Sequence, residues 1–167
     1  MTSIEELLKT SGLPRGEEAN ARKVYLHAGQ LYASAEPTEI VTILGSCVAV
    51  CMFDRARGVG GLNHFMLPTE SATPSPRYAR HANEMLIKQL VALGASRSRL
   101  EAKIFGGASV LKMGGDTGSD LGMRNIEAAR LHLANEKIPI LGEDVGGLRG
   151  RKLVFLTGDG TALIKQV

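Results

Sequence analysis

The sequence predicts an α+β fold, a layered sandwich of mixed or antiparallel β-sheet with flanking helices. Three observations lead to this prediction. Short β-branched apolar runs fill the first half of the chain, amphipathic helical patterns alternate with further strands in the second half, and glycines punctuate the runs. With 167 residues, of which 44% are hydrophobic, the chain is long enough for one domain with a real core.

Most of the expected strands end at glycine or proline turns. They cover residues 24–26, 30–34, 40–44, 48–53, 59–67, 100–105, 138–141, 153–156 and 162–167. The runs 48–53 and 59–67 flank a turn at 54–58, which predicts that they are neighbouring antiparallel strands. A hairpin is expected around Gly158-Asp159-Gly160.

Two helices are expected between the later strands. Residues 79–93 carry an apolar stripe that ends before Gly94, a typical helix C-cap. Asn125 is expected to cap a second helix that runs to about Lys137. Residues 1–22, with a short helix after Ser3, are expected to be an N-terminal extension, and residues 23–167 a single domain.

The composition argues against several classes of protein. The 20 basic and 17 acidic residues give a net charge of only +3, and they are scattered, unlike the one-sided basic face of a nucleic-acid binder. No segment has the roughly 20 apolar residues that span a bilayer, so no membrane insertion is expected. The first residues do not read as a signal peptide, and we expect a cytoplasmic protein with free thiols.

Cys47 is the first candidate catalytic residue. It follows Gly45 and Ser46, where a sharp turn of small residues leaves room for a substrate carbonyl and frees backbone N–H groups for an oxyanion hole. The alternative is that Cys47 is a small buried hydrophobe, as most free cysteines are. Cys51 lies inside an apolar run and is expected to be structural. On one strand the two cysteines would lie about 13 Å apart, too far for a disulfide.

His64 is the candidate base, since an imidazole in an apolar strand needs a polar partner. If the two strands pair, His64 comes near Cys47 and can lower its pKa as a thiolate–imidazolium pair; the alternative is a structural histidine. Thr42 is the candidate third group that orients His64, although threonine is also a common strand residue. His27 and His132 are expected at the surface. No metal-ligand spacing occurs, so neither a metal nor a cofactor is expected.

Five blocks, in order, resemble the CheD chemoreceptor glutamine deamidase family. They are LGSCVAVC at 44–51, NHFMLP at 63–68, KIFGGA at 103–108, GMRN at 122–125, and DVGG at 144–147 with GRK at 150–152. The resemblance runs from about residue 23 to residue 167. It implies Cys47 as nucleophile, His64 as its histidine and Thr42 as the assisting residue, in a fold similar to bacterial toxin deamidase catalytic domains.

The resemblance also implies a substrate and partners. Family members convert glutamines on the cytoplasmic helices of methyl-accepting chemotaxis receptors to glutamate, and some bind the phosphatase CheC. We expect oxyanion stabilisation by the backbone near Gly45 and Ser46, and further residues are expected to bind substrate: Asn63, Phe65, Gly106 and Gly107. Three alternatives remain: a thiol peptidase or transglutaminase, a non-catalytic module that regulates a CheC-like phosphatase, and a small nucleic-acid binder.

Overall fold

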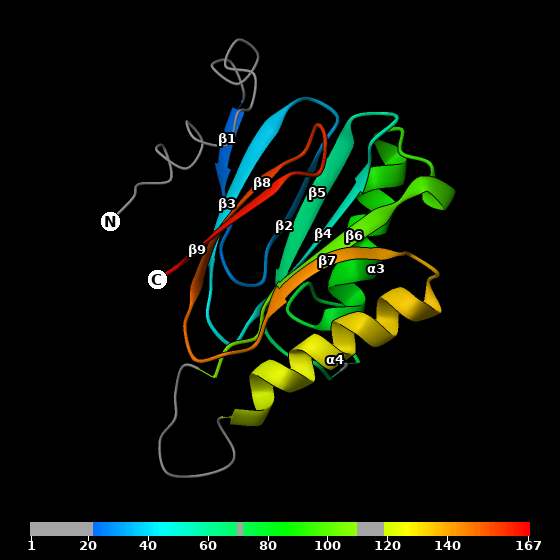
Figure 1. The fold of residues 1–167 in the computed structure, drawn as a ribbon. Coiled ribbons are helices and arrows are strands. Elements are labelled where there is room, and N and C mark those ends of the chain that lie inside the picture. Colours follow the sequence, from blue (N-terminus) through cyan, green and yellow to red (C-terminus); the bar gives the residue numbers. More distant parts are fainter. Residues whose placement is uncertain (1–21, 70–71, 110–118) are drawn as a thin grey trace.

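The computed structural model describes residues 22–69, 72–109 and 119–167. Within these ranges two β-sheets and two α-helices form three layers, with the helices stacked on the outer face of the larger sheet (Figure 1). The predicted mixed α+β sandwich is therefore confirmed at this level. The predicted N-terminal extension and its short helix lie almost wholly outside the described residues.

The smaller sheet has four strands in the order β1 (Arg22–Tyr25), β3 (Thr38–Leu44), β8 (Arg151–Leu156) and β9 (Ala162–Gln166). β1 and β3 are parallel, and the other pairs are antiparallel. β8 and β9 form the hairpin that the Gly158-Asp159-Gly160 turn predicts.

The larger sheet has five strands in the order β2 (Leu31–Ser34), β5 (Val59–Phe65), β4 (Val48–Asp54), β6 (Glu101–Gly106) and β7 (Ile140–Val145). β4 and β5 are antiparallel neighbours, as their turn predicts. β6 and β7 are parallel, because the chain between them crosses over through a helix. β7 runs further toward the C-terminus than the predicted strand 138–141.

Helix α3 (Ala79–Ala92) agrees with its prediction, and a single 3-10 turn, η1 (Arg97–Arg99), follows it. The prediction for the second helix was wrong at its start. Helix α4 spans Ser119–Asn135, so Asn125 lies inside the helix and is not its N-cap. A cap side chain bonds its own first turn, whereas the Asn125 amide reaches out to two carbonyls in other segments. His132 is also corrected, because it is buried on α4 and not at the surface.

Two apolar cores lie on the two sides of the larger sheet. One, between the sheets, contains Ala49, Cys51 and Leu62, while the other, under the helices, contains Val48 and Val50. Because both faces are covered, every residue of β4 and β5 is buried. The alternation along β4 therefore separates side chains that face the smaller sheet from those that face the helices.

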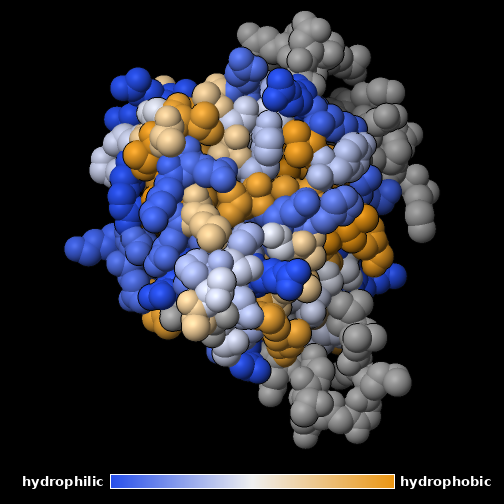
Figure 2. All heavy atoms as spheres, turned by 180° about the vertical axis from the view of Figure 1, so that it is seen from behind, coloured by the Kyte–Doolittle hydropathy of each residue, from blue (hydrophilic) through white to orange (hydrophobic). Residues whose placement is uncertain are grey.

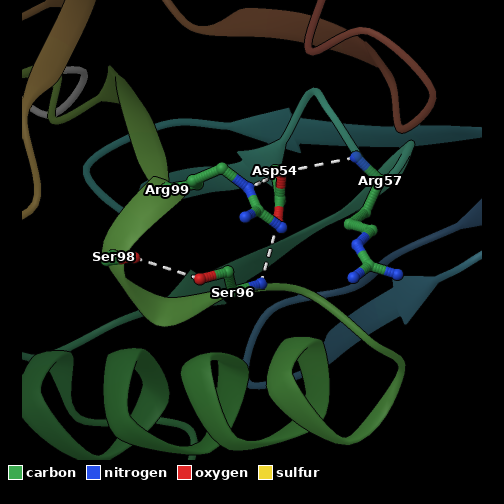
Figure 3. Close-up of polar contacts among 5 residues, drawn as sticks. All are labelled: Asp54, Arg57, Ser96, Ser98 and Arg99. Carbon is green, nitrogen blue, oxygen red and sulfur yellow. Dashed lines mark hydrogen bonds and ion pairs between the residues drawn. The ribbon is translucent and has the colours of Figure 1, made fainter.

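The two ends of β4 carry polar groups. At its C-terminal end the buried Asp54 carboxylate accepts hydrogen bonds from the Arg99 guanidinium at 3.1 and 3.2 Å and from the Ser96 N–H at 2.8 Å (Figure 3). This cluster ties the β4–β5 turn to the segment between α3 and β6. Cys47 immediately precedes the other end of the strand.

The exposed surface has no single apolar stripe on the face turned away in Figure 1. There, hydrophilic side chains separate the apolar ones into several small groups (Figure 2). Exposed apolar side chains that stand singly are normal for a folded protein. No helix in the described part of the chain is long and apolar enough to cross a membrane.

Candidate active site

Thr42 and His64 meet across the space between the two sheets. Thr42 shares the inward face of β3 with Ile40 and Leu44, while His64 lies on the face of β5 that it shares with Leu62. The Thr42 hydroxyl oxygen lies 2.7 Å from the His64 Nδ1 atom. The predicted partnership of these two side chains is therefore present as a buried hydrogen bond.

This hydrogen bond fixes the tautomer of His64. The Thr42 hydroxyl has a single proton, and it donates this proton to the Leu26 carbonyl oxygen at 2.8 Å. The hydroxyl can then only accept from His64, so the Nδ1 atom must carry the hydrogen. The other ring nitrogen, Nε2, is left with its lone pair available as a base.

Burial keeps the His64 imidazole neutral. Its side chain is only 4% exposed, and desolvation lowers its pKa from 6.5 to about 4, with a smaller contribution from His27. Near neutral pH the ring is therefore uncharged. Burial thus favours the neutral ring in the free protein, and the expected thiolate–imidazolium pair stays a prediction.

Cys47 lies in the bend that leads into β4. Ala49 on β4 is the register partner of His64 on β5, and Cys47 is two residues before Ala49 in the chain. Cys47 is half-buried, and Cys51 on β4 is fully buried. Of the two thiols, Cys47 is thus the accessible one.

Burial favours the protonated form of the Cys47 thiol. Burial raises its pKa, an effect that its own backbone N–H partly offsets. No hydrogen bond joins its sulfur to His64 within the described ranges. Burial thus favours the neutral form of both the Cys47 thiol and the His64 imidazole, and it raises the pKa of Cys51 well above the ordinary value.

The Gly106-Gly107 turn holds the segment that carries Cys47. The N–H of Gly107 donates to the Cys47 carbonyl at 2.8 Å, and the N–H of Ala108 donates to the Gly45 carbonyl at 2.9 Å. Gly106 has a φ of +105°, and a Cβ there would collide with the Cys47 carbonyl oxygen. Both glycines were predicted to bind substrate, which stays a prediction; their observed contacts are with the backbone of the Cys47 segment.

Asn63 and Phe65 lie on the opposite face of β5 from His64 and are fully buried. The Asn63 carboxamide accepts from the Val50 N–H at 3.1 Å and donates to Asn83 on α3 at 2.8 Å. Direct contact with substrate stays a prediction for both residues. Their packing favours support of β5 from the helix side.

Two polar residues beside the site were not predicted to have a role in it. Asn125 contacts the segments that follow β3 and β5, and the buried Arg151 donates to the Gly146 carbonyl at 2.8 Å and pairs with Asp144. Both lie in the sequence blocks quoted above, but nothing in local spacing indicates which carbonyl a side chain will reach. No group of three or more metal-ligating side chains occurs among the residues with described positions.

Comparison with known proteins decides the family. The family model described as "CheD chemotactic sensory transduction" matches residues 66–166. This chain belongs to the CheD family. The match begins just after His64, so the three candidate catalytic residues lie outside it.

Three relatives show how far the similarity extends. A "Probable chemoreceptor glutamine deamidase CheD 1" of Anaeromyxobacter dehalogenans is 49% identical over 87% of this chain and 85% of its own length. A "Probable chemoreceptor glutamine deamidase CheD" of Laribacter hongkongensis is 46% identical over 83% of this chain and 69% of its own length. The protein of the same name from Thiobacillus denitrificans is 41% identical over 99% of this chain and 84% of its own length.

Among solved structures, Bacillus licheniformis hypothetical protein YfiH is similar, with 16% identity and a TM-score of 0.44 over 68% of this chain and 49% of that chain. A likeness at this level carries no argument about function. The predicted likeness to toxin deamidase domains stays a prediction.

Proposed function

We propose that this chain is a protein-glutamine deamidase that converts glutamines on the cytoplasmic helices of chemotaxis receptors to glutamate. The names of its relatives, probable chemoreceptor glutamine deamidases, support the reaction and the substrate. The observation that carries the chemistry is the fixed tautomer of His64, which leaves Nε2 as a free base. The accessible Cys47 thiol lies two residues before Ala49, the register partner of His64. Such a substrate implies work in the cytoplasm.

In the first half-reaction the Cys47 sulfur attacks the side-chain carboxamide carbon of a glutamine. His64 Nε2 takes the thiol proton as the C–S bond forms, since both groups start neutral. His64 then gives this proton to the amide nitrogen, which leaves as ammonia. A thioester between Cys47 and the former glutamine remains.

In the second half-reaction His64 Nε2 takes a proton from water while the water oxygen attacks the thioester carbon. The C–S bond breaks, the sulfur recovers a proton, and a glutamate side chain is released. Throughout, the Thr42 hydroxyl holds the ring through Nδ1 and shares the charge that the ring gains. Neither half-reaction calls for an oxidant, a reductant or a cofactor.

The contact between the sulfur and Nε2 is expected to shorten when substrate binds. Hydrogen bonds between catalytic groups are often long in a free enzyme and tighten in the substrate complex. The Cys47 segment is anchored through its Cys47 and Gly45 carbonyls, and the His64 backbone is anchored to Gln30 and Gly29.

Mass spectrometry of a receptor cytoplasmic fragment tests the proposal. Wild-type protein is expected to add about one dalton at each modified glutamine, because an amide becomes an acid without chain cleavage. Cys47→Ala and His64→Ala are expected to abolish this gain. Cys51→Ala is the matched control, since Cys51 is the other thiol of the chain, is fully buried, and should leave the reaction unchanged when removed.

The same measurement separates the alternatives. Cleaved fragments would indicate a peptidase, and a mass gain equal to an added amine would indicate a transglutaminase. An intact, unmodified fragment would contradict the proposal and favour the regulatory module. The CheC-like partner stays a prediction.

A further inference from the structure

Asn125 joins the two segments that carry the proposed nucleophile and base. Its side-chain Nδ2 donates to the Ser46 carbonyl at 3.0 Å and to the Met66 carbonyl at 3.0 Å. Ser46 directly precedes Cys47, and Met66 comes two residues after His64. One fully buried amide on α4 therefore spans the ends of both segments.

The orientation of this amide is determined by its surroundings. Two carbonyl oxygens lie against one end of it, and only an NH₂ group can donate to both. The opposite atom, Oδ1, is buried and has no partner within the part of the chain that the structure describes. A buried acceptor without a partner costs free energy, which a leucine of similar size would avoid. The two donated hydrogen bonds are what distinguish Asn125 from an apolar residue here.

The bond to Ser46 acts on Cys47 through one peptide unit. The Ser46 carbonyl and the Cys47 N–H belong to the same planar trans peptide, so they point in opposite directions. An amide that holds the carbonyl on one side aims the N–H to the other. The Cys47 N–H lies beside its own sulfur, where it lowers the pKa of the thiol, and has no carbonyl partner in the described ranges.

Helix α4 approaches the site closely enough to make this contact rigid. Gly122, one turn before Asn125, packs directly against the Gly107 carbonyl, and Cβ atoms at either glycine would collide with the other segment. Gly107 in turn donates to the Cys47 carbonyl. The carbonyls on both sides of the Cys47 N–H are thus held, one by Asn125 and one by Gly107.

We infer that Asn125 is a positioning residue that aims the Cys47 N–H as an oxyanion donor for the tetrahedral intermediate. The inference rests on the proposed deamidase function and adds a residue to it. Asn125 does not touch the substrate. It acts by holding the Ser46 carbonyl, and its second bond keeps the end of the His64 strand at a constant distance from the donor.

The test compares two substitutions with a matched control. Asn125→Leu removes both donors while nearly preserving size, and Asn125→Ala removes them with a cavity. Leu133→Ala is the control, because Leu133 is a fully buried residue two turns further along α4, in the core under the larger sheet. Thermal unfolding measures the stability of each variant, and rates are expressed per folded molecule.

Two reactions of Cys47 distinguish a specific effect on the orientation of its N–H from a general loss of structure in its segment. Deamidation of a receptor cytoplasmic fragment passes through an oxyanion, whereas alkylation by iodoacetamide at pH 9 does not. Loss of one oxyanion donor lowers kcat by about 10²–10³-fold. For both Asn125 variants we expect a kcat loss of that size, a KM within about threefold of wild type, and an alkylation rate within about threefold, whereas Leu133→Ala keeps kcat.

The outcomes are distinct. A kcat for Asn125→Leu close to that of Leu133→Ala would overturn the inference while leaving the deamidase proposal intact. Equal losses of deamidation and alkylation would also overturn it, since Asn125 would then only maintain the fold of the segment. A wild-type chain that leaves the receptor fragment unmodified would overturn the proposed function, and the inference with it.

Discussion

The hydroxyl of Thr42 offers a direct test of how the base is prepared. Thr42→Val keeps the branched shape of the side chain but removes the oxygen that accepts from His64 Nδ1–H and donates to the Leu26 carbonyl. The imidazole then has no partner that selects its tautomer. The Nδ1–H also remains buried, because the ring is only 4% exposed.

The size of the effect follows from the lost hydrogen bond. A buried donor left without its partner costs about 1–3 kcal/mol. Where that energy holds the ring in its reactive tautomer and orientation, it corresponds to a loss of about 5- to 150-fold in kcat. Thr42→Ser retains the oxygen and is the matched control. It is expected to keep most of the activity despite the loss of a methyl group.

The assay has two parts. Intact mass of a receptor fragment over time gives kcat for wild type and both variants, and ¹⁵N chemical shifts of the His64 ring report the tautomer without reference to activity. Wild type is expected to show a protonated Nδ1 and a pyridine-like Nε2 near neutral pH. A ring protonated at Nε2, or a Thr42→Val enzyme as active as Thr42→Ser, would refute the reasoning.

Four further predictions concern the electrostatics and packing of the same framework. Burial raises the pKa of the Cys47 thiol, so the rate of its alkylation should rise with pH through a midpoint above roughly 8.5, the pKa of free cysteine. A midpoint below pH 7 would instead indicate an ion pair with His64. Because the pKa of His64 is lowered in the folded state, the unfolded state binds a proton more readily as pH falls from 6.5 to about 4. The free energy of unfolding of wild type, measured by chemical denaturation, should therefore fall by about 3 kcal/mol more over this window than that of His64→Gln. Equal losses would contradict the argument that burial lowers this pKa. Gly106→Ala should lower Tm more than Gly94→Ala. The two glycines have nearly the same φ, +105° and +107°, but only a Cβ at position 106 would collide with the Cys47 carbonyl oxygen. Equal shifts in Tm would count against that collision. Asp54→Asn should lower the free energy of unfolding by about 1.5–3 kcal/mol, because the hydrogen bonds to Arg99 and Ser96 lose their charge. It should leave kcat unchanged, because Asp54 lies at the end of β4 opposite to Cys47. A lower kcat per folded molecule would contradict this independence.

Local pattern was sufficient to predict most of the strands. β4 and β5 combine β-branched apolar runs with a short turn, and this turn also predicts their antiparallel pairing. Helix α3 was predicted for a similar reason, since its stripe is complete and Gly94 ends it. These features depend on neighbours along the chain, which a single sequence contains.

The parts that could not be predicted depend on contacts between distant segments. Asn125 looks like a helix cap because asparagine is favoured there, but its amide is used by two carbonyls far away in sequence. The protonation state of the site is another example. Spacing suggested an ion pair between Cys47 and His64, whereas burial, which depends on the whole sandwich, favours two neutral groups.

The site is assembled from both sheets, and this determines which substitutions should lower its activity. Thr42 belongs to the smaller sheet and His64 to the larger one, so the Thr42–His64 hydrogen bond exists only while the two sheets keep their separation. Side chains of the intervening core, such as Leu44 and Phe155, set that separation. The Asp54 cluster, in contrast, joins parts of the larger sheet and its connections, and contributes to stability without setting the distance between the sheets (Figure 3). Catalysis by this chain should therefore depend more on the packing between the sheets than on total stability, because a small slide of one sheet over the other misplaces the base before the fold is lost.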